Sequence, residues 1–256
     1  MKTPLLSFLF FLVIFGACIS DRKPASAVDY SLLVNPFIGT DFTGNTYPGA
    51  QAPFGMVQLS PDNGLPGWDR ISGYYYPDST IAGFSHTHLS GTGAGDLYDI
   101  SYMPVTLPYR EAEAPLGIHS KFRHSDEEAS AGYYRVLLKD YNINVELTAT
   151  ERCGIQRYTF PKAQSAVFLN LKKAMNWDFT QDSHIEVVDS CTIQGYRFSD
   201  GWARGQRVFF RTRFSKPFRS SEIDTTAIIQ DGKTIGTAYV ARFNFDTTDG
   251  EEIVLC

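Results

Sequence analysis

The residues best suited to chemistry lie in a glycine-rich stretch in the first half of the chain. Trp68 and Asp69 follow a glycine, and His86 and His88 stand two positions apart within residues 83–93. An indole can cover the apolar C–H face of a sugar ring, and a carboxylate can accept hydrogen bonds from its hydroxyl groups. We therefore predict that Trp68 and Asp69 contact a carbohydrate. The alternative is that Trp68 only fills the edge of a β-sandwich.

The two histidines allow three interpretations. Side chains at i and i+2 of an extended strand point to the same face, so His86 and His88 could act together. A metal site would need a third ligand, for which Asp96 and Asp99 are candidates, but the spacing matches no metal-binding motif. We predict instead that both histidines hydrogen-bond to substrate or to loop backbone. A purely structural role is the alternative.

Other catalytic motifs are absent from the sequence. Residues 91–96 are rich in glycine, but the Lys-Ser/Thr of a phosphate-binding loop does not follow them. No Gly-x-Ser-x-Gly nucleophile motif occurs. Glu111 and Glu113 have no apolar setting that would raise a pKa for acid catalysis, and Glu127 and Glu128 are typical of a solvated surface. The sequence therefore predicts no catalytic acid–base pair.

The stretch that must position these residues runs from Gly39 to Met103. Glycine, proline and small polar residues interrupt it too often for a sustained helix or strand, which is typical of loops. Its many aromatic residues argue against disorder, because disordered segments have low hydrophobicity. We predict an ordered, site-forming loop system that provides no wall of the packed core. Trp177 and Trp202, farther along the chain, are predicted to be core or rim residues.

From residue 104 onward the hydrophobic period is two. Ile143, Val145 and Leu147 alternate with polar residues, as in a half-buried antiparallel strand. Short runs with turn residues between them predict strands at 143–149, 156–160, 166–171, 185–188, 192–198, 208–214 and 237–245. No amphipathic helix of ten residues is evident. The fold class is therefore predicted to be all-β, as a large antiparallel sandwich or a barrel.

Composition and targeting signals narrow the class of protein. A net charge of −5 without a basic run gives no support for nucleic-acid binding. Residues 1–20 are predicted to be a signal peptide, because Lys2 precedes an apolar run at 5–15 that is too short to span a membrane. Small residues before Cys18 predict lipidation of that cysteine, with ordinary secretion as the alternative. Residues 21–29 would then form a polar tether.

The remaining cysteines and the last residues of the sequence give two further predictions. Cys153, Cys191 and Cys256 form neither a disulfide framework nor a zinc motif, although a Cys153–Cys191 bridge could form in an oxidising compartment. Residues 253–256 are predicted to form an apolar strand that is cut short.

An ordered set of motifs resembles the N-terminal domain of glycoside hydrolase family 92. The set comprises VNPFIGT (34–40), YPGA (47–50), PFGMVQLSPD (53–62), GWD (67–69), GFSHTHLSGTG (83–93), MP (103–104), VELTAT (145–150), RYTFP (157–161), GWA (201–203) and FSKPF (214–218). The resemblance extends from residue 30 to residue 256. Cys153 and Gln156 depart from the pattern, and Asp41-Phe42-Thr43 replaces a Gly/His-rich stretch.

The resemblance implies a calcium-dependent, inverting exo-α-mannosidase that acts on N-glycans or mannans. It implies that residues 30–256 form a galactose-mutarotase-like β-supersandwich, and that a helical (α/α) toroid absent from this chain supplies the catalytic carboxylates and the calcium ligands. Trp68 and Asp69 would then line the sugar pocket, and His86 and His88 match the family's Ser-His-Thr-His pattern. The implied location is the bacterial periplasm or cell surface, with membrane contact only through a lipid anchor.

The resemblance also implies that this chain alone is inactive. Inverting hydrolysis needs one carboxyl group as acid and another as base, on opposite faces of the sugar. Neither is expected within these 256 residues. The partners expected are mannose-containing glycans and the catalytic domain. The alternatives are a stand-alone carbohydrate-binding module without turnover and a poorly folded remnant.

Overall fold

A computed structural model describes residues 28–91, 93–113, 116–173 and 176–256. The chain divides into a short first unit, residues 1–32, and a large second unit, residues 33–256. The 3₁₀ turn η1 (Tyr30–Leu33) lies where the two units meet in the sequence. Cys18, the predicted signal peptide and residues 21–27 of the predicted tether lie outside the described residues. Within the described part, no helix has the length and apolar character needed to cross a membrane.

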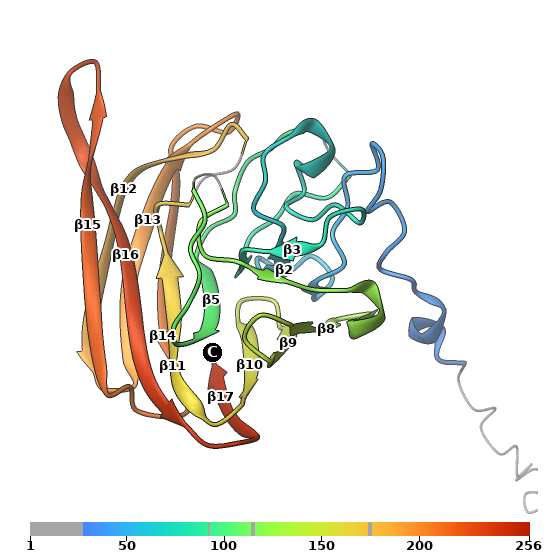
Figure 1. Cartoon of the computed structure of the whole chain (residues 1–256). Coiled ribbons are helices and arrows are strands. Elements are labelled where there is room, and N and C mark those ends of the chain that lie inside the picture. The colour runs from blue at the N-terminus through green and yellow to red at the C-terminus, as the bar shows by residue number, and fades with distance from the viewer. Residues whose placement is uncertain (1–27, 92, 114–115, 174–175) are drawn as a thin grey trace, which may run out of the picture. The chain divides into compact units, whose positions relative to one another are not determined.

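The second unit is built from antiparallel sheets (Figure 1). The largest has seven strands, in the order β1 (Ala50–Gln51), β2 (Gln58–Asp62), β4 (Gly83–Ser85), β5 (Ser101–Thr106), β11 (Ala163–Asn170), β16 (Lys233–Thr247) and β15 (Ser220–Gln230). A five-stranded sheet has the order β17 (Glu251–Leu255), β10 (Gly154–Phe160), β9 (Ile143–Ala149), β8 (Tyr133–Leu138) and β7 (Glu127–Ser130).

Two smaller sheets complete the unit. One has the order β12 (Phe179–Asp189), β13 (Thr192–Asp200) and β14 (Gln206–Arg213), and the other pairs β3 (Thr80–Ile81) with β6 (Ser120–Lys121). The helical elements of the described part are three 3₁₀ turns, namely η1, η2 (Trp68–Arg70) and η3 (His124–Asp126). The structure therefore confirms the predicted all-β antiparallel sandwich.

The three-stranded and five-stranded sheets are joined at a seam between β14 and β17. Phe214 forms an isolated bridge with Leu255, and the Arg213 N–H donates to the Cys256 carbonyl oxygen at 2.7 Å. The joined layer faces the seven-stranded sheet, since Tyr102 of β5 hydrogen-bonds Thr212 of β14 at 2.7 Å and Phe214 packs on Phe243 of β16 at 5.4 Å between ring centroids. The hydrophobic core fills the space between these two layers.

The period-two pattern predicted seven strands of this sandwich, β9 to β14 and β16, but not β1 to β8. In β9 the alternating residues Ile143, Val145 and Leu147 are buried. The bounds of β9 agree with the prediction, whereas β12 and β16 extend well beyond their predicted ends. The sequence missed β15, because this edge strand is exposed on both faces and carries no alternation. Residues 251–255 form a strand that pairs with β10 across five residues.

One prediction about the stretch 39–103 is wrong. It was expected to provide no wall of the core, yet β2 and β4 belong to the seven-stranded sheet, and Leu59 and Phe84 are fully buried. The sequence pattern did not reveal these strands, because they are short and because glycines beside them pack directly against neighbouring backbone. A Cβ added at Gly49, for example, would lie 2.2 Å from the Leu59 carbonyl oxygen.

Candidate functional site

Three exposed tryptophans lie on loops that the fold gathers at one end of the second unit. Trp68 lies in η2, Trp177 precedes β12 and Trp202 follows β13. Their side chains are 56%, 45% and 78% exposed, respectively. In Figure 1 the loop near residue 70 and the loop near residue 200 both lie at the top of the unit. Trp177 and Trp202 were predicted to be core or rim residues, and their exposure shows that both are rim residues.

Trp68 and Trp177 form an open aromatic corner. Their ring centroids are 5.9 Å apart, and the ring planes meet at 63°. Gly93 lies against Trp68, because a Cβ added there would lie 3.5 Å from its Cη2 atom. Two inclined indoles with exposed surface can contact a sugar ring on two sides. The interpretation of Trp68 as a mere plug of the sandwich edge therefore does not fit its exposure.

Asn176 and Asp96 connect the loops that carry the tryptophans. The Gly67 N–H donates to Asn176 Oδ1 at 2.9 Å, and the Trp177 N–H donates to the Gly95 carbonyl at 3.2 Å. The two carboxylate oxygens of buried Asp96 accept from the N–H groups of Trp202 at 2.9 Å and Ala203 at 2.6 Å. Segments about a hundred residues apart in sequence are thereby fixed together. These links fix the backbone beside all three indoles.

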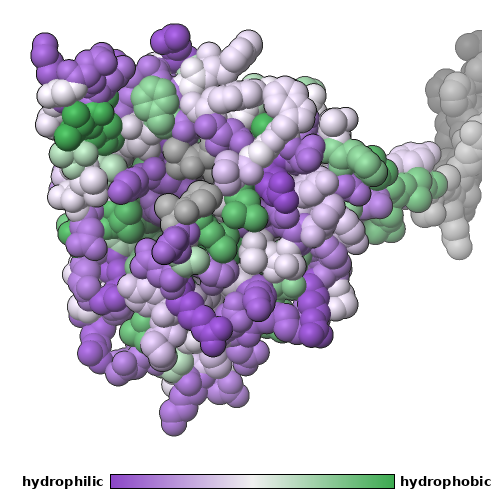
Figure 2. Space-filling view, turned by 45° about the horizontal axis from the view of Figure 1, so that its top comes forward, coloured by the Kyte–Doolittle hydropathy of each residue, from purple (hydrophilic) through white to green (hydrophobic). Residues whose placement is uncertain are grey.

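A hollow adjoins this corner on the Trp202 side. Its volume is about 440 Å³, and it is lined by Leu89, Gly93, Ala94, Asp96, Leu97, Trp202 and Ala203. Figure 2 turns the loop-bearing end of the unit forward and shows hydrophobic side chains in patches on a mostly polar surface. The end that carries the tryptophans therefore combines aromatic surface with a shallow concavity.

The Asp69 carboxylate is available to a ligand. It is half-buried, and among the described residues it makes no hydrogen bond or ion pair. The neighbouring Arg70 is occupied, since its guanidinium binds Asp78 through Nε at 2.6 Å and through Nη2 at 2.5 Å. Asp69 is therefore a hydrogen-bond acceptor next to Trp68 in the sequence that no described residue occupies.

His88 is committed to contacts inside the fold. Its Nδ1–H donates to the Gln58 carbonyl oxygen at 2.7 Å, and its Nε2 lies 2.9 Å from the Asp62 carboxylate and 3.1 Å from the Ser85 hydroxyl. Burial would raise the pKa of Asp62, but Lys173 and His88 outweigh this effect and lower it. These contacts hold β2 to the segment after β4. The predicted role of His88 in substrate binding stays a prediction.

His86 keeps one nitrogen available. Its Nδ1–H donates to the Ile100 carbonyl oxygen at 2.8 Å. Burial lowers the pKa of His86 to about 4, so the ring is neutral near pH 7 and Nε2 is a hydrogen-bond acceptor. The predicted substrate contact of His86 stays a prediction. Asp99, weighed in the sequence as a metal ligand, instead accepts from the Thr87 hydroxyl at 2.7 Å and binds Arg197.

A buried arginine at the base of the site was not predicted. Arg197 of β13 is fully buried, donating from Nη1 to Asp99 at 2.6 Å, from Nε to Thr180 at 3.0 Å and from Nη2 to Asp178. Burial raises the pKa of Asp178 to about 6 even though Arg197 opposes the shift. Because Asp178 directly follows Trp177, this cluster anchors one side of the tryptophan corner. The only signal in the sequence was a charged residue at an inward position of a strand.

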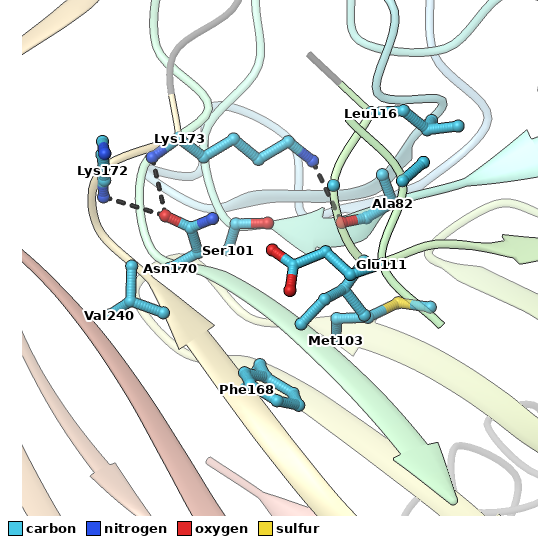
Figure 3. A pocket seen from close by; sticks show the side chains of 13 residues that line it. Ala82, Ser101, Met103, Glu111, Leu116, Phe168, Asn170, Lys172, Lys173 and Val240 are labelled. Atoms are coloured by element: carbon cyan, nitrogen blue, oxygen red, sulfur yellow. Dashed lines mark hydrogen bonds between the residues drawn. The ribbon is translucent and has the colours of Figure 1, made fainter. Parts of the chain in front are cut away.

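Another cavity lies between residues 111–112 and 116–118 on one side and strands β5 and β11 on the other (Figure 3). Its volume is about 520 Å³. Glu111 is an exposed residue that lines this cavity together with Met103, Leu116 and Phe168. Glu111 is the single carboxylate among the described lining residues, so this cavity offers no acid–base pair.

Metal-binding and disulfide chemistry receive no support from the described residues. Within those ranges, no three or more His, Cys, Asp or Glu side chains gather as a metal site. Cys153, Cys191 and Cys256 are free, so the Cys153–Cys191 bridge is not formed in this structure.

Comparisons with known proteins agree with this fold. Residues 33–255 match the model of the glycosyl hydrolase family 92 N-terminal domain. The family GH92 alpha-mannosidase BT3965 from Bacteroides thetaiotaomicron, solved in complex with mannoimidazole, superposes with a TM-score of 0.79 at 35% identity, covering 88% of this chain and 31% of that chain. The GH92 inverting mannosidase BT2199 from the same organism has a TM-score of 0.70 at 24% identity, covering 90% and 31%, and supports the fold alone.

The chain is also similar in sequence to a protein named as a glycosidase. An uncharacterized secreted glycosidase from Arthroderma benhamiae is 28% identical over 138 residues, which is 50% of this chain and 17% of that protein. The chain thus spans about a third or less of the length of the relatives it matches.

Proposed function

The chain belongs to glycosyl hydrolase family 92 as an N-terminal domain of that family, and on this premise we propose that it forms the glycan-contacting wall of an exo-α-mannosidase active site. The observation that carries the proposal is the exposed corner of Trp68 and Trp177 with the unpaired carboxylate of Asp69 beside it. Indole faces and a free acceptor are the groups that hold a hexose by its C–H face and its hydroxyls.

The bond-breaking step belongs, in this proposal, to polypeptide beyond this chain. Inverting hydrolysis needs two carboxyl groups about 6.5–9.5 Å apart, one to protonate the leaving oxygen and one to activate water. At the corner Asp96 is occupied by two backbone N–H groups, which leaves Asp69 as the one available carboxylate of the described residues there. The match covers 31% of each of these solved relatives, so about two thirds of their length lies outside it. We therefore assign the acid, the base and any calcium ligands to that further chain.

The proposal extends to substrate and location. N-glycans or mannans are the proposed substrates, with terminal α-mannose held at the corner. Export and lipidation of Cys18 are proposed from the first 20 residues alone. The rival function is a stand-alone binding module, which would use the same corner without turnover.

The test is to titrate the purified chain with methyl α-mannoside and to assay it in parallel for hydrolysis of an aryl α-mannoside with calcium. We expect binding that Trp68→Ala weakens about tenfold, and no turnover. Turnover by this chain would refute the assignment of catalysis to further polypeptide. Binding unaffected by Trp68→Ala would refute the corner as the sugar site. Activity on adding a separately expressed catalytic domain would separate the wall of an enzyme from a stand-alone module.

A further inference from the structure

The outer face of the three-stranded sheet carries an exposed aromatic surface far along the chain from Trp68. The inward residues Ile185, Ile193 and Thr212 are buried, so the alternate positions of β12, β13 and β14 point outward. These outward positions include His184, Tyr196, Phe198 and Phe209, with Phe209 70% exposed. We call this set, together with Arg207 and Arg211, the sheet platform.

The register places the platform residues in rows across the three strands. His184 pairs with Tyr196 and Tyr196 with Phe209, which forms one aromatic row. Phe198 and Arg207 are partners in the row on one side. On the other side, Glu186, Gln194 and Arg211 are cross-strand neighbours. The aromatic row is therefore bordered by polar groups on both sides.

Side-chain contacts hold the rows in place. The rings of Tyr196 and Phe198 stack at 4.4 Å, and Phe209 stands at 57° to Tyr196 and at 75° to Phe198. The Arg207 guanidinium lies 5.3 Å from the centroid of the Phe198 ring. In the polar row, Gln194 donates to Glu186 at 2.8 Å and accepts from Arg211 at 3.3 Å. Pre-ordered rings and polar groups lower the entropy cost of binding.

We propose that the sheet platform is a second glycan-binding surface, which holds an internal stretch of a hexose polymer while the tryptophan corner takes the chain end. The proposal rests on the proposed function for the class of ligand. Two strand spacings of about 4.8 Å separate β12 from β14, so the platform is about 10 Å wide and suits consecutive sugar rings. The rings supply contact with C–H faces, and the carboxylate, amide and guanidinium groups of the bordering rows supply hydrogen bonds to hydroxyls.

The observations favour a glycan over a docked protein at this face. Charged and amide groups border the aromatic row on both sides, where they can hydrogen-bond the hydroxyl groups of a glycan. The aromatic surface is two residues deep on β13, at Tyr196 and Phe198, and one residue deep on β12 and β14, which fits a narrow polymer. A protein partner becomes one outcome of the test.

The experiment measures the affinity of the whole purified chain for soluble α-mannan and for methyl α-mannoside by calorimetry. The variants are Phe209→Ala, Phe209→Trp, Trp68→Ala and the control Phe54→Ala, which removes a fully exposed phenylalanine outside the platform. We expect Phe209→Ala to weaken mannan binding roughly three- to tenfold and to leave methyl α-mannoside unchanged. Phe209→Trp should retain mannan binding, and Phe54→Ala should behave as wild type.

The two proposals fail separately in this design. Weaker methyl α-mannoside binding in Trp68→Ala, with mannan affinity reduced but still sensitive to Phe209→Ala, supports both. The platform is refuted if wild type does not bind mannan, or if Phe209→Ala and Phe54→Ala bind it equally well. Unchanged mannan affinity together with an altered sedimentation coefficient in Phe209→Ala would assign the face to a protein contact and also refute the platform. Unfolding curves of each variant show that the loss is local.

Discussion

Replacing Arg197 with methionine should destabilise the domain more than any other single charge removal among the described residues. Its side chain and those of Asp99 and Asp178 are 0% exposed in their two ion pairs. Methionine fills a similar volume but leaves two buried carboxylates without a cationic partner. Breaking a buried pair in this way costs about 3–5 kcal/mol. A domain of this size has a total stability of about 5–15 kcal/mol, so the variant should unfold at a much lower urea concentration.

The matched control is Arg219→Met. The Arg219–Asp246 pair has a similar N–O distance, 2.9 Å, but its side chains are 68% and 60% exposed. Surface pairs contribute about 0–1 kcal/mol, so this variant should unfold close to wild type. Urea unfolding followed by tryptophan fluorescence measures both. The triple variant Arg197→Met, Asp99→Asn, Asp178→Asn should recover part of the loss, because no buried charge then remains. Equal midpoints for Arg197→Met and Arg219→Met would refute the reasoning.

Three further predictions concern the site. Trp68→Ala should weaken methyl α-mannoside binding about tenfold, a hot-spot loss of about 1.4 kcal/mol, whereas Trp202→Ala outside the corner should change it less than twofold; calorimetry measures both. Asp178→Asn should change the pH dependence of stability. Because burial raises the pKa of Asp178 in the folded state to about 6, the folded protein binds more protons, and wild type should lose stability relative to the variant as pH rises from about 4 to about 6. A free energy of unfolding that rises in wild type relative to the variant over this pH range, measured by urea titrations, would contradict this. Asp96→Ala should leave the Trp202 and Ala203 N–H groups without their acceptor, and hydrogen exchange at residues 201–205 should become faster while β9 stays protected.

Strands could be predicted from the sequence where one face of the strand is buried and the other faces solvent. Ile143, Val145 and Leu147 alternate with polar residues, so β9 could be bounded from the sequence. Nothing comparable marks β15, because its side chains face solvent on both sides and its pairing with β16 is a backbone property. The short strands β2 and β4 escaped notice for a related reason, since glycine and proline around them mask the period.

The site was predictable in its residue types and not in its assembly. Trp68 and Asp69 were identified because indole and carboxylate suit sugars. The contribution of Trp177 depends on Asn176 bonding to Gly67, a contact that spans 109 positions. Arg197 was invisible for the same reason: its partners Asp99 and Asp178 come from distant segments. Local patterns carry no information about such contacts.

The seam between β14 and β17 has a consequence for how the protein is made. Strand β10 can pair with β9 as soon as both have left the ribosome, but its other edge waits for residues 251–255, almost a hundred positions later. Strand β14 waits for the same segment. Until then the nascent chain exposes two unpaired strand edges, which are templates for aggregation. Synthesis of this domain should therefore depend on chaperones that shield those edges until translation passes residue 255.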